Sequence, residues 1–186
     1  MDKIAWGITG SGDFMRESLD LMKDIAAKND VRIDVFLSRE AEIVLKYYHY
    51  MSEIKSNFSN LFTEQGPNIP FLSGKLQIGK YRVFIICPAT ANTVAKIAHG
   101  IADSLITNSA AQAMKVDVPV YIFPVDQKEG EVMTILPDGR QLKLHIRDVD
   151  LKNVNLLKDM QGITVVEKTR EIWDVIQAST FPSAPE

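Results

Sequence analysis

The chain has 186 residues, of which 46% are hydrophobic and 24% are charged, and its formal net charge is −3. This length and composition are typical of one globular domain, and the single cysteine excludes an internal disulfide framework. The small negative charge offers no basic surface for nucleic acid, and no stretch approaches the roughly 20 apolar residues of a membrane helix. With no signal-peptide pattern at the N-terminus, we expect a cytoplasmic protein with no nucleic-acid or membrane partner.

Strand and helix patterns alternate along the chain. Consecutive apolar residues, as at 83–86, indicate strands buried on both faces, and apolar residues three and four apart indicate helices. In chain order we predict a strand at 4–9, a helix within 10–30, a strand at 31–38, a helix at 39–51, a strand at 83–87, a helix from about 90, a helix at 104–115, and then strands at 118–124 and 162–167 and a helix at 168–178. The first helix is expected to turn four apolar side chains inward: Phe14, Leu19, Met22 and Ile25. This order predicts an α/β fold with a Rossmann-like, doubly wound and mostly parallel sheet.

Other segments depart from this alternation. Residues 56–74 lack a clean period and are expected to form a loop with short turns. Two β-like runs around Pro137-Asp138-Gly139 predict a β-hairpin arm at about 130–147. The composition of 179–186 is typical of a flexible tail. Because we find no repeat or linker, we expect a single domain over 1–178.

Small hydroxyl residues follow three of the predicted strands. They are Thr9 and Ser11 after the first, Ser38 beside Arg39 after the second, and Thr90 and Thr93 after the third. Ligands of doubly wound sheets lie beyond the carboxyl ends of the strands, so these turns are expected to border one shared site. Each hydroxyl is also typical of an ordinary helix N-cap.

The turn ITGSGDF at 8–14 has two glycines at which the backbone can approach a ligand closely. Gly10 and Gly12 flank Ser11, whose hydroxyl can donate to a phosphate near the start of a helix. The dinucleotide pattern GxGxxG is incomplete, because Met15 stands where its third glycine belongs. A tight turn capped by Ser11 is the alternative. The three histidines do not share metal-ligand spacing, so no metal site is predicted, and the sequence identifies no catalytic residue.

The segment PATANTVAKIAHGIAD at 88–103 closely resembles the signature of the homo-oligomeric flavin-containing cysteine decarboxylase superfamily. The resemblance extends from residue 4 to about 124 and includes the glycine turn and the serine after the second strand. It implies a Rossmann-type flavoprotein that binds FMN rather than FAD and assembles as a homotrimer or a multiple of trimers.

The resemblance also implies which residues hold FMN. Those matching the phosphate-binding turns are Gly10, Ser11, Gly12 and Ser38, with Arg39 at the border of the same crevice. Those matching the turn that meets the phosphate, the ribityl chain and the ring edge are Ala89, Thr90, Asn92 and Thr93. Neutral donors and a helix N-terminus suit a phosphate dianion without a lysine.

Two departures from the superfamily argue against cysteine decarboxylation. Gly74 stands where the decarboxylases carry their catalytic histidine. The stretch FPVDQKEGEV at 123–132 lacks the asparagine and tryptophan of their substrate clamp, and it places Asp126 where a substrate carboxylate would dock.

Within the superfamily, residues 4–18 and the hairpin are most similar to archaeal-type flavoproteins, including dihydromethanopterin reductases. This likeness implies an FMN-dependent reductase that transfers hydride to dihydromethanopterin, a dihydropterin, with electrons from ferredoxin or an NAD(P)H-linked donor. The alternatives are an electron-transfer flavoprotein served by ferredoxin and a flavin prenyltransferase-like enzyme. The latter needs a second, basic phosphate pocket that we do not find in the sequence.

Overall fold

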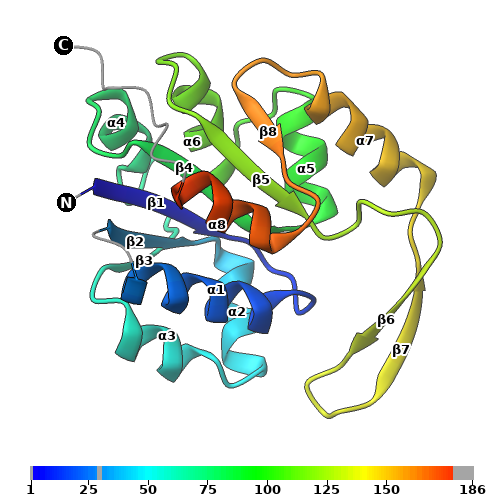
Figure 1. The fold of residues 1–186 in the computed structure, drawn as a ribbon. Coiled ribbons are helices and arrows are strands. Elements are labelled where there is room, and N and C mark those ends of the chain that lie inside the picture. The colour runs from blue at the N-terminus through cyan, green and yellow to red at the C-terminus, as the bar shows by residue number, and fades with distance from the viewer. Residues whose placement is uncertain (1, 29–30, 178–186) are drawn as a thin grey trace.

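The fold is built on one central sheet. The structure is a computed structural model that describes residues 2–28 and 31–177. Within them, six strands form a sheet of order β3-β2-β1-β4-β5-β8, and every neighbouring pair is parallel. The strands are β1 (Asp2–Ile8), β2 (Val31–Leu37), β3 (Leu61–Thr63), β4 (Val83–Ala89), β5 (Val120–Pro124) and β8 (Ile163–Val165) (Figure 1). The predicted α/β class and doubly wound sheet are confirmed, and the strand order reverses between β1 and β4, where such sheets bind ligands.

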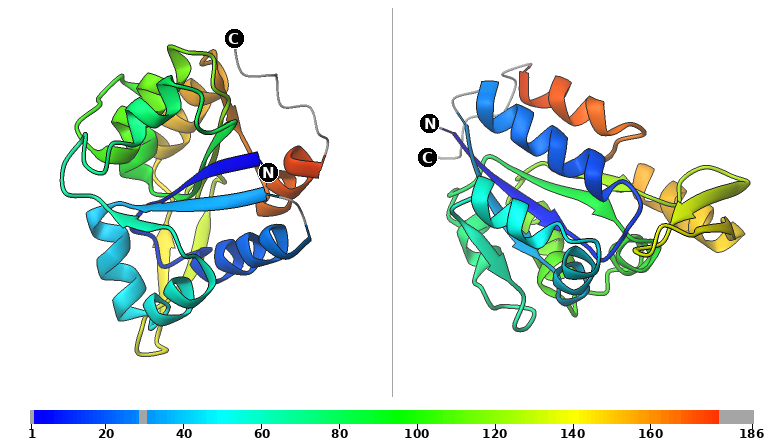
Figure 2. Two further views of the ribbon diagram at one scale, coloured as in Figure 1. Left: turned by 90° about the vertical axis from the view of Figure 1, so that its left-hand side faces the viewer. Right: turned by 90° about the horizontal axis from the view of Figure 1, so that it is seen from below.

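Helices cover both faces of the sheet (Figure 2). One face carries α1 (Met15–Lys28), α2 (Arg39–Tyr47), α3 (Met51–Asn57) and α8 (Thr169–Gln177). The other face carries α4 (Leu72–Gln77), α5 (Ala91–Ala98), α6 (Leu105–Met114) and α7 (Asp148–Lys158). The sheet therefore separates two hydrophobic clusters. Among the described residues, no helix has the length and apolar character needed to cross a bilayer.

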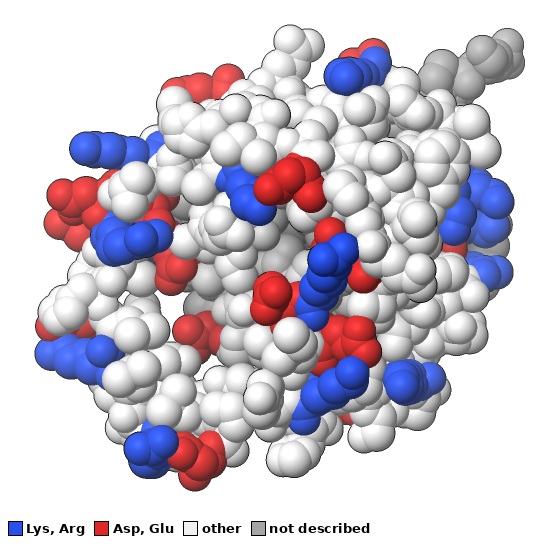
Figure 3. Space-filling model, turned by 180° about the vertical axis from the view of Figure 1, so that it is seen from behind, with Lys and Arg blue, Asp and Glu red and all other residues white. Residues whose placement is uncertain are grey.

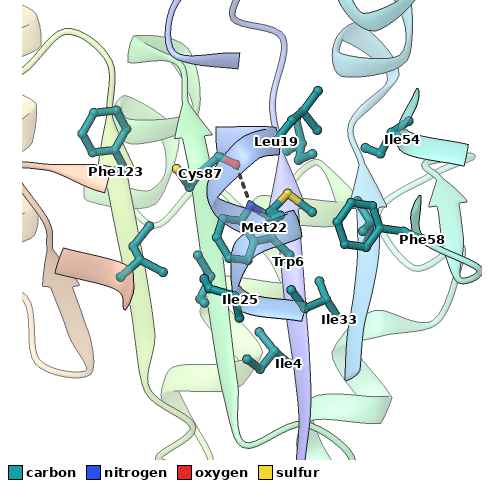
Figure 4. Close-up of a cluster of buried hydrophobic side chains, with 14 of the residues drawn as sticks. Ile4, Trp6, Leu19, Met22, Ile25, Ile33, Ile54, Phe58, Cys87 and Phe123 are labelled. Carbon is teal, nitrogen blue, oxygen red and sulfur yellow. Dashed lines mark hydrogen bonds between the residues drawn. The ribbon is translucent and has the colours of Figure 1, made fainter. Parts of the chain in front are cut away.

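The core beneath α1 fixes the two strands that flank the reversal of strand order. Leu19, Met22 and Ile25 point from the helix onto the sheet, each at most 1% exposed (Figure 4). Burying a side chain of this size contributes about 1.5–3 kcal/mol. Trp6 on β1 lies under them, and its indole Nε1–H donates to the carbonyl oxygen of Cys87 on β4 at 2.7 Å. This bond satisfies a buried polar group and holds β1 against β4.

The expectation that Phe14 faces inward is wrong. Helix α1 begins at Met15, and Phe14 precedes it with φ of +59° and a side chain 42% exposed. Its ring meets Phe123 edge to face at 5.0 Å between centroids. The helix predicted at 39–51 is in fact two helices, because the left-handed backbone of His49, with φ of +60°, interrupts helical geometry between α2 and α3.

Three other elements were absent from the prediction. The region expected to be a loop, 56–74, contains β3 and the start of α4, because β3 has only three residues and takes its register from β2 rather than from its own pattern. Helix α7 has no apolar period of its own, since its buried side includes Asp150 and Asn153 beside two apolar residues.

The predicted hairpin arm is confirmed and projects from the end of β5 (Figure 1). Strands β6 (Glu131–Ile135) and β7 (Gln141–His145) pair antiparallel, and Gly139 in the turn has φ of +84°. Two side chains tie β6 to the main body: Tyr48 donates from its hydroxyl to the Ile135 carbonyl at 2.8 Å, and Thr134 donates to Asp13 Oδ1 at 2.6 Å. The tail predicted at 179–186 lies outside the described residues.

Candidate functional site

A cavity of about 500 Å³ opens where β1, β2 and β4 end. Its walls are the turns that follow these strands, the segment after β3 and the start of α6. The lining residues are Thr9, Gly10, Ser38, Arg39, Glu40, Val44, Glu64, Pro67, Thr90, Asn92, Thr93, Lys96, Asp103 and Ser104. The cavity therefore lies at the carboxyl edge of the sheet, beside the reversal of strand order.

Three helices begin at this cavity, each with a hydroxyl N-cap. Ser38 accepts from the Ala41 amide at 3.0 Å and caps α2, and Thr90 accepts from the Thr93 amide at 3.3 Å and caps α5. Ser104 forms a capping box with Thr107 at the start of α6. The first N–H groups of a helix have no intrahelical partner, and its N-terminus carries roughly half a positive charge. Together these termini favour an anion in the cavity.

Thr9 braces the turn between β4 and α5. Its hydroxyl donates to the Pro88 carbonyl at 2.9 Å and accepts from the Thr90 amide at 2.8 Å. Because both bonds fix the entry to α5, the Thr9 hydroxyl positions the turn and is not a free donor to a ligand. The amide groups of Ala91 and Asn92, in the first turn of α5, are the ones left for a ligand.

The glycines after β1 allow close packing. A Cβ atom on Gly10 would lie 2.6 Å from the Cβ of Glu40, closer than real Cβ contacts come. A Cβ on Gly12 would collide with the ring and hydroxyl of Tyr48. The turn after β1 is thereby pressed against α2, and its backbone borders the cavity with no side chain between them.

Four of the five charged residues that line the cavity are engaged with other groups. Lys96 Nζ contacts both carboxylate oxygens of Asp103 at 2.9 Å, and Arg39 donates from its guanidinium to the Gln65 carbonyl at 2.8 Å. Glu64 accepts from the amide of Leu105 at 3.0 Å and from that of Arg39 at 3.4 Å, which joins the starts of α6 and α2. An anion in the cavity would therefore meet hydroxyl and amide donors.

The structure brings most of the predicted site residues together. Those lining the cavity are Gly10, Ser38, Arg39, Thr90, Asn92 and Thr93. Ser11, Gly12 and Ala89 do not line it. Ser11 is 8% exposed and donates to the Asp13 carbonyl at 3.2 Å, and Ala89 is fully buried at the end of β4. The prediction missed Glu64, because no local pattern brings the end of β3 to this edge.

Two further cavities lie between α1 and the arm. One, of about 730 Å³, is walled by the stacked rings of Tyr48 and Tyr50, whose centroids are 6.2 Å apart, and by apolar residues of the arm. The other, of about 360 Å³, shares Asp13, Phe14 and Met133 with it and also has Asp126 in its wall. The hollow under the arm thus combines aromatic and apolar walls with charged side chains, which include Asp13, Arg16, Glu17 and Asp20.

The surface shows no single-sign field on the face seen from behind. Figure 3 shows acidic and basic side chains interspersed there. Such a surface does not attract a polyanion over long range.

Known proteins resemble the chain over nearly its whole length. The model of the Flavoprotein family matches residues 1–181. An uncharacterised protein of Methanocaldococcus jannaschii is 53% identical over 95% of each chain, and dihydromethanopterin reductase (acceptor) of Methanosarcina mazei is 31% identical over 93% of this chain and 98% of its own. Among solved structures, Burkholderia xenovorans DmrB in complex with FMN, described as a cubic protein cage for redox transfer, superimposes with a TM-score of 0.82 at 32% identity, covering 95% of this chain and 94% of that one.

Proposed function

Because the chain belongs to the Flavoprotein family, we propose that it is an FMN-dependent oxidoreductase that reduces dihydromethanopterin to tetrahydromethanopterin. The observation that carries the proposal is the cavity at the carboxyl edge of the sheet, with three helix N-termini and neutral donors around it. Relatives that share nearly the whole chain support the chemistry, since one is named dihydromethanopterin reductase and another was solved with FMN.

The residues of the cavity fit FMN. Its phosphate dianion suits the starts of α2 and α5, where Ser38 and Thr93 supply hydroxyls and Asn92 an amide. Gly10 lines the cavity and carries no side chain, so the backbone of the first turn can approach the cofactor there. A volume of about 500 Å³ lies within the range of cofactor sites. The incomplete dinucleotide pattern agrees with a mononucleotide.

When bound, FMN supplies hydride chemistry. The chain's part is to bind and orient. The helix termini would hold the phosphate end, and the Asn92 side chain, which lines the cavity, would bond the ribityl chain or the ring edge. The hollow under the arm, with its stacked Tyr48 and Tyr50 rings, offers aromatic walls that suit a planar pterin.

The decarboxylase half of the superfamily site has no counterpart in this chain. Gly74 lies buried in α4, and a Cβ atom there would collide with the ring of Phe71. Glycine itself offers no side chain for acid–base chemistry at this position. This favours a reductase over a cysteine decarboxylase.

We also propose that the protein is a homo-oligomer built from trimers. Four apolar side chains of the arm are 40–60% exposed: Met133, Ile135, Leu142 and Leu144. Apolar surface of this kind is typical of an interface between subunits. Sedimentation at micromolar concentration tests it, and a flavin-loaded monomer would contradict it.

One experiment tests the reductase proposal. The purified holoprotein is photoreduced without oxygen, dihydromethanopterin is added, and the flavin absorbance is followed. Reoxidation with formation of tetrahydromethanopterin supports the reductase. Reoxidation by ferredoxin but not by the pterin would contradict it and identify an electron carrier.

A further inference from the structure

Asp126 lies at the same edge of the sheet as the proposed FMN site. It follows the end of β5, where the chain leaves for the arm (Figure 1). The amide of Val125 donates to the carbonyl of Ala89 at 3.0 Å, which ties this segment to the last residue of β4. Ala89 is followed in the chain by Thr90, the N-cap of α5. Asp126 is thus one strand away from the turn that lines the cavity.

The side chain of Asp126 borders an apolar cavity. The cavity of about 360 Å³ has two carboxylates, Asp126 and Asp13, and its other walls are Phe14, Val125, Val132 and Met133. Asp126 is half-buried and lines this cavity. A reacting group placed in the cavity could exchange a proton with it.

No structural role in hydrogen bonding or ion pairing explains the half-buried carboxylate of Asp126. Among the described residues, none donates a hydrogen bond to its carboxylate or forms an ion pair with it. The nearby Arg147 is engaged by Asp150, to which it donates at 2.9 and 2.7 Å. Gln127 donates instead to two backbone carbonyls. A half-buried carboxylate without a partner costs free energy, and such groups gather at functional sites.

We propose that Asp126 is the general acid that protonates the ring nitrogen of the substrate when its C=N bond is reduced. This inference rests on the proposed reductase function and adds the proton donor that the reaction needs.

The reaction is balanced as follows. The C6 carbon of the dihydropterin accepts a hydride, two electrons and a proton nucleus, from reduced FMN, and the C6=N5 double bond becomes a single bond. The N5 nitrogen accepts a proton from the Asp126 carboxyl, which becomes a carboxylate. A proton from water then restores the carboxyl, because its side chain is not fully buried.

The electrostatics of the site support a protonated Asp126. Burial raises the pKa of its carboxyl above the usual value, and the negative charges of Asp150 and Asp13 raise it further. Arg147 lowers it, with a smaller effect. The residues of the arm that face the same cavity are apolar. The protonated fraction near neutral pH is therefore larger than for an ordinary aspartate.

The test compares the wild type with Asp126→Asn, which keeps the size of the side chain and cannot titrate. Asp159→Asn is the matched control, because Asp159 is an exposed carboxyl at the end of α7. Reoxidation of the photoreduced flavin by dihydromethanopterin should slow about 100-fold or more in Asp126→Asn, as expected for loss of a general acid. The pH dependence that this acidic group gives to the wild-type rate should be absent from the variant. Reoxidation by ferricyanide, which needs no proton, should be unchanged, as should FMN binding.

A second readout does not depend on turnover. Carboxyl ¹³C NMR of the wild type should show a resonance that is absent from Asp126→Asn and titrates above the ordinary aspartate pKa of about 3.9. If the wild type reduces the pterin and Asp126→Asn does so at the same rate, the role of Asp126 is overturned and the proposed reductase function is unaffected. A resonance titrating at or below the ordinary value would also overturn it. A wild type that does not react with the pterin at all would overturn the proposed function and this role with it.

Discussion

Replacing Asn92 with alanine is expected to weaken FMN binding without destabilising the apoprotein. Asn92 is the second residue of α5, its side chain is exposed at the cavity, and its amide bonds no other described residue. Alanine is the better helix former, so the melting temperature of the apoprotein should stay the same or rise slightly. The amide is therefore available to the cofactor and contributes little to the fold.

The expected size of the effect follows from one lost hydrogen bond. Leaving a desolvated group of the cofactor unpaired costs about 1–3 kcal/mol. Since about 1.4 kcal/mol changes an equilibrium constant tenfold, the dissociation constant for FMN should rise about 5- to 150-fold. The measurement is a titration of FMN fluorescence with apoprotein.

Asn155→Ala is the matched control, because Asn155 is also an exposed helical asparagine, on α7 and outside the cavity lining. Its FMN affinity should equal that of the wild type. An unchanged affinity in Asn92→Ala would refute the placement of FMN at the start of α5. A lower apoprotein melting temperature would instead assign Asn92 a structural role.

Four other outcomes are expected. The purified protein should contain about one FMN per chain and no adenine, and mass spectrometry showing FAD or NAD would contradict this. Gly10→Ala should lower both the melting temperature and the FMN affinity, because the new Cβ would lie 2.6 Å from that of Glu40, and such overpacking costs about 1–3 kcal/mol. An unchanged melting curve would show that the turn shifts to accommodate the methyl group. Hydrogen bonds from Arg16 and Lys23 lower the pKa of Glu53 to about 2, so its contribution to stability is present above the unfolded pKa of about 4.3 and is lost as pH falls toward 2. Glu53→Gln should therefore be less stable than the wild type at pH 7 by denaturant unfolding, the difference should shrink as pH falls through about 2, and a difference that does not shrink over this range would contradict the pairing. The holoprotein should release no CO₂ from peptidyl or pantothenoyl cysteine, and turnover would overturn the reductase proposal.

The sheet could be predicted because its signals are local. Apolar runs locate the long strands, and hydroxyl residues at their ends identify the edge where the cavity opens, so Ser38 and Thr90 could be found from the sequence alone. Glu64 could not, because it reaches the cavity only through the pairing of β3 with β2. Phe14 was misplaced for a related reason. Helical spacing places it on the inner face, but the chain turns at this residue and the helix starts one position later.

On the proposed placement of FMN, the chain keeps the binding part of its superfamily's site and lacks the decarboxylating part, and the two lie on different elements of the fold. The cavity proposed for FMN is made by β1, β2 and β4 and by helices that begin at their ends, so its geometry is fixed by the central strands. Gly74 and Asp126 lie outside this lining, on α4 and after β5. Gly74 has no side chain that could act where the decarboxylases carry their histidine, and Asp126 follows β5 in place of their substrate clamp. Changes at such positions alter the reaction while the strand ends that hold the cofactor stay in place, so the same cofactor site can serve a reduction in one protein and a decarboxylation in another.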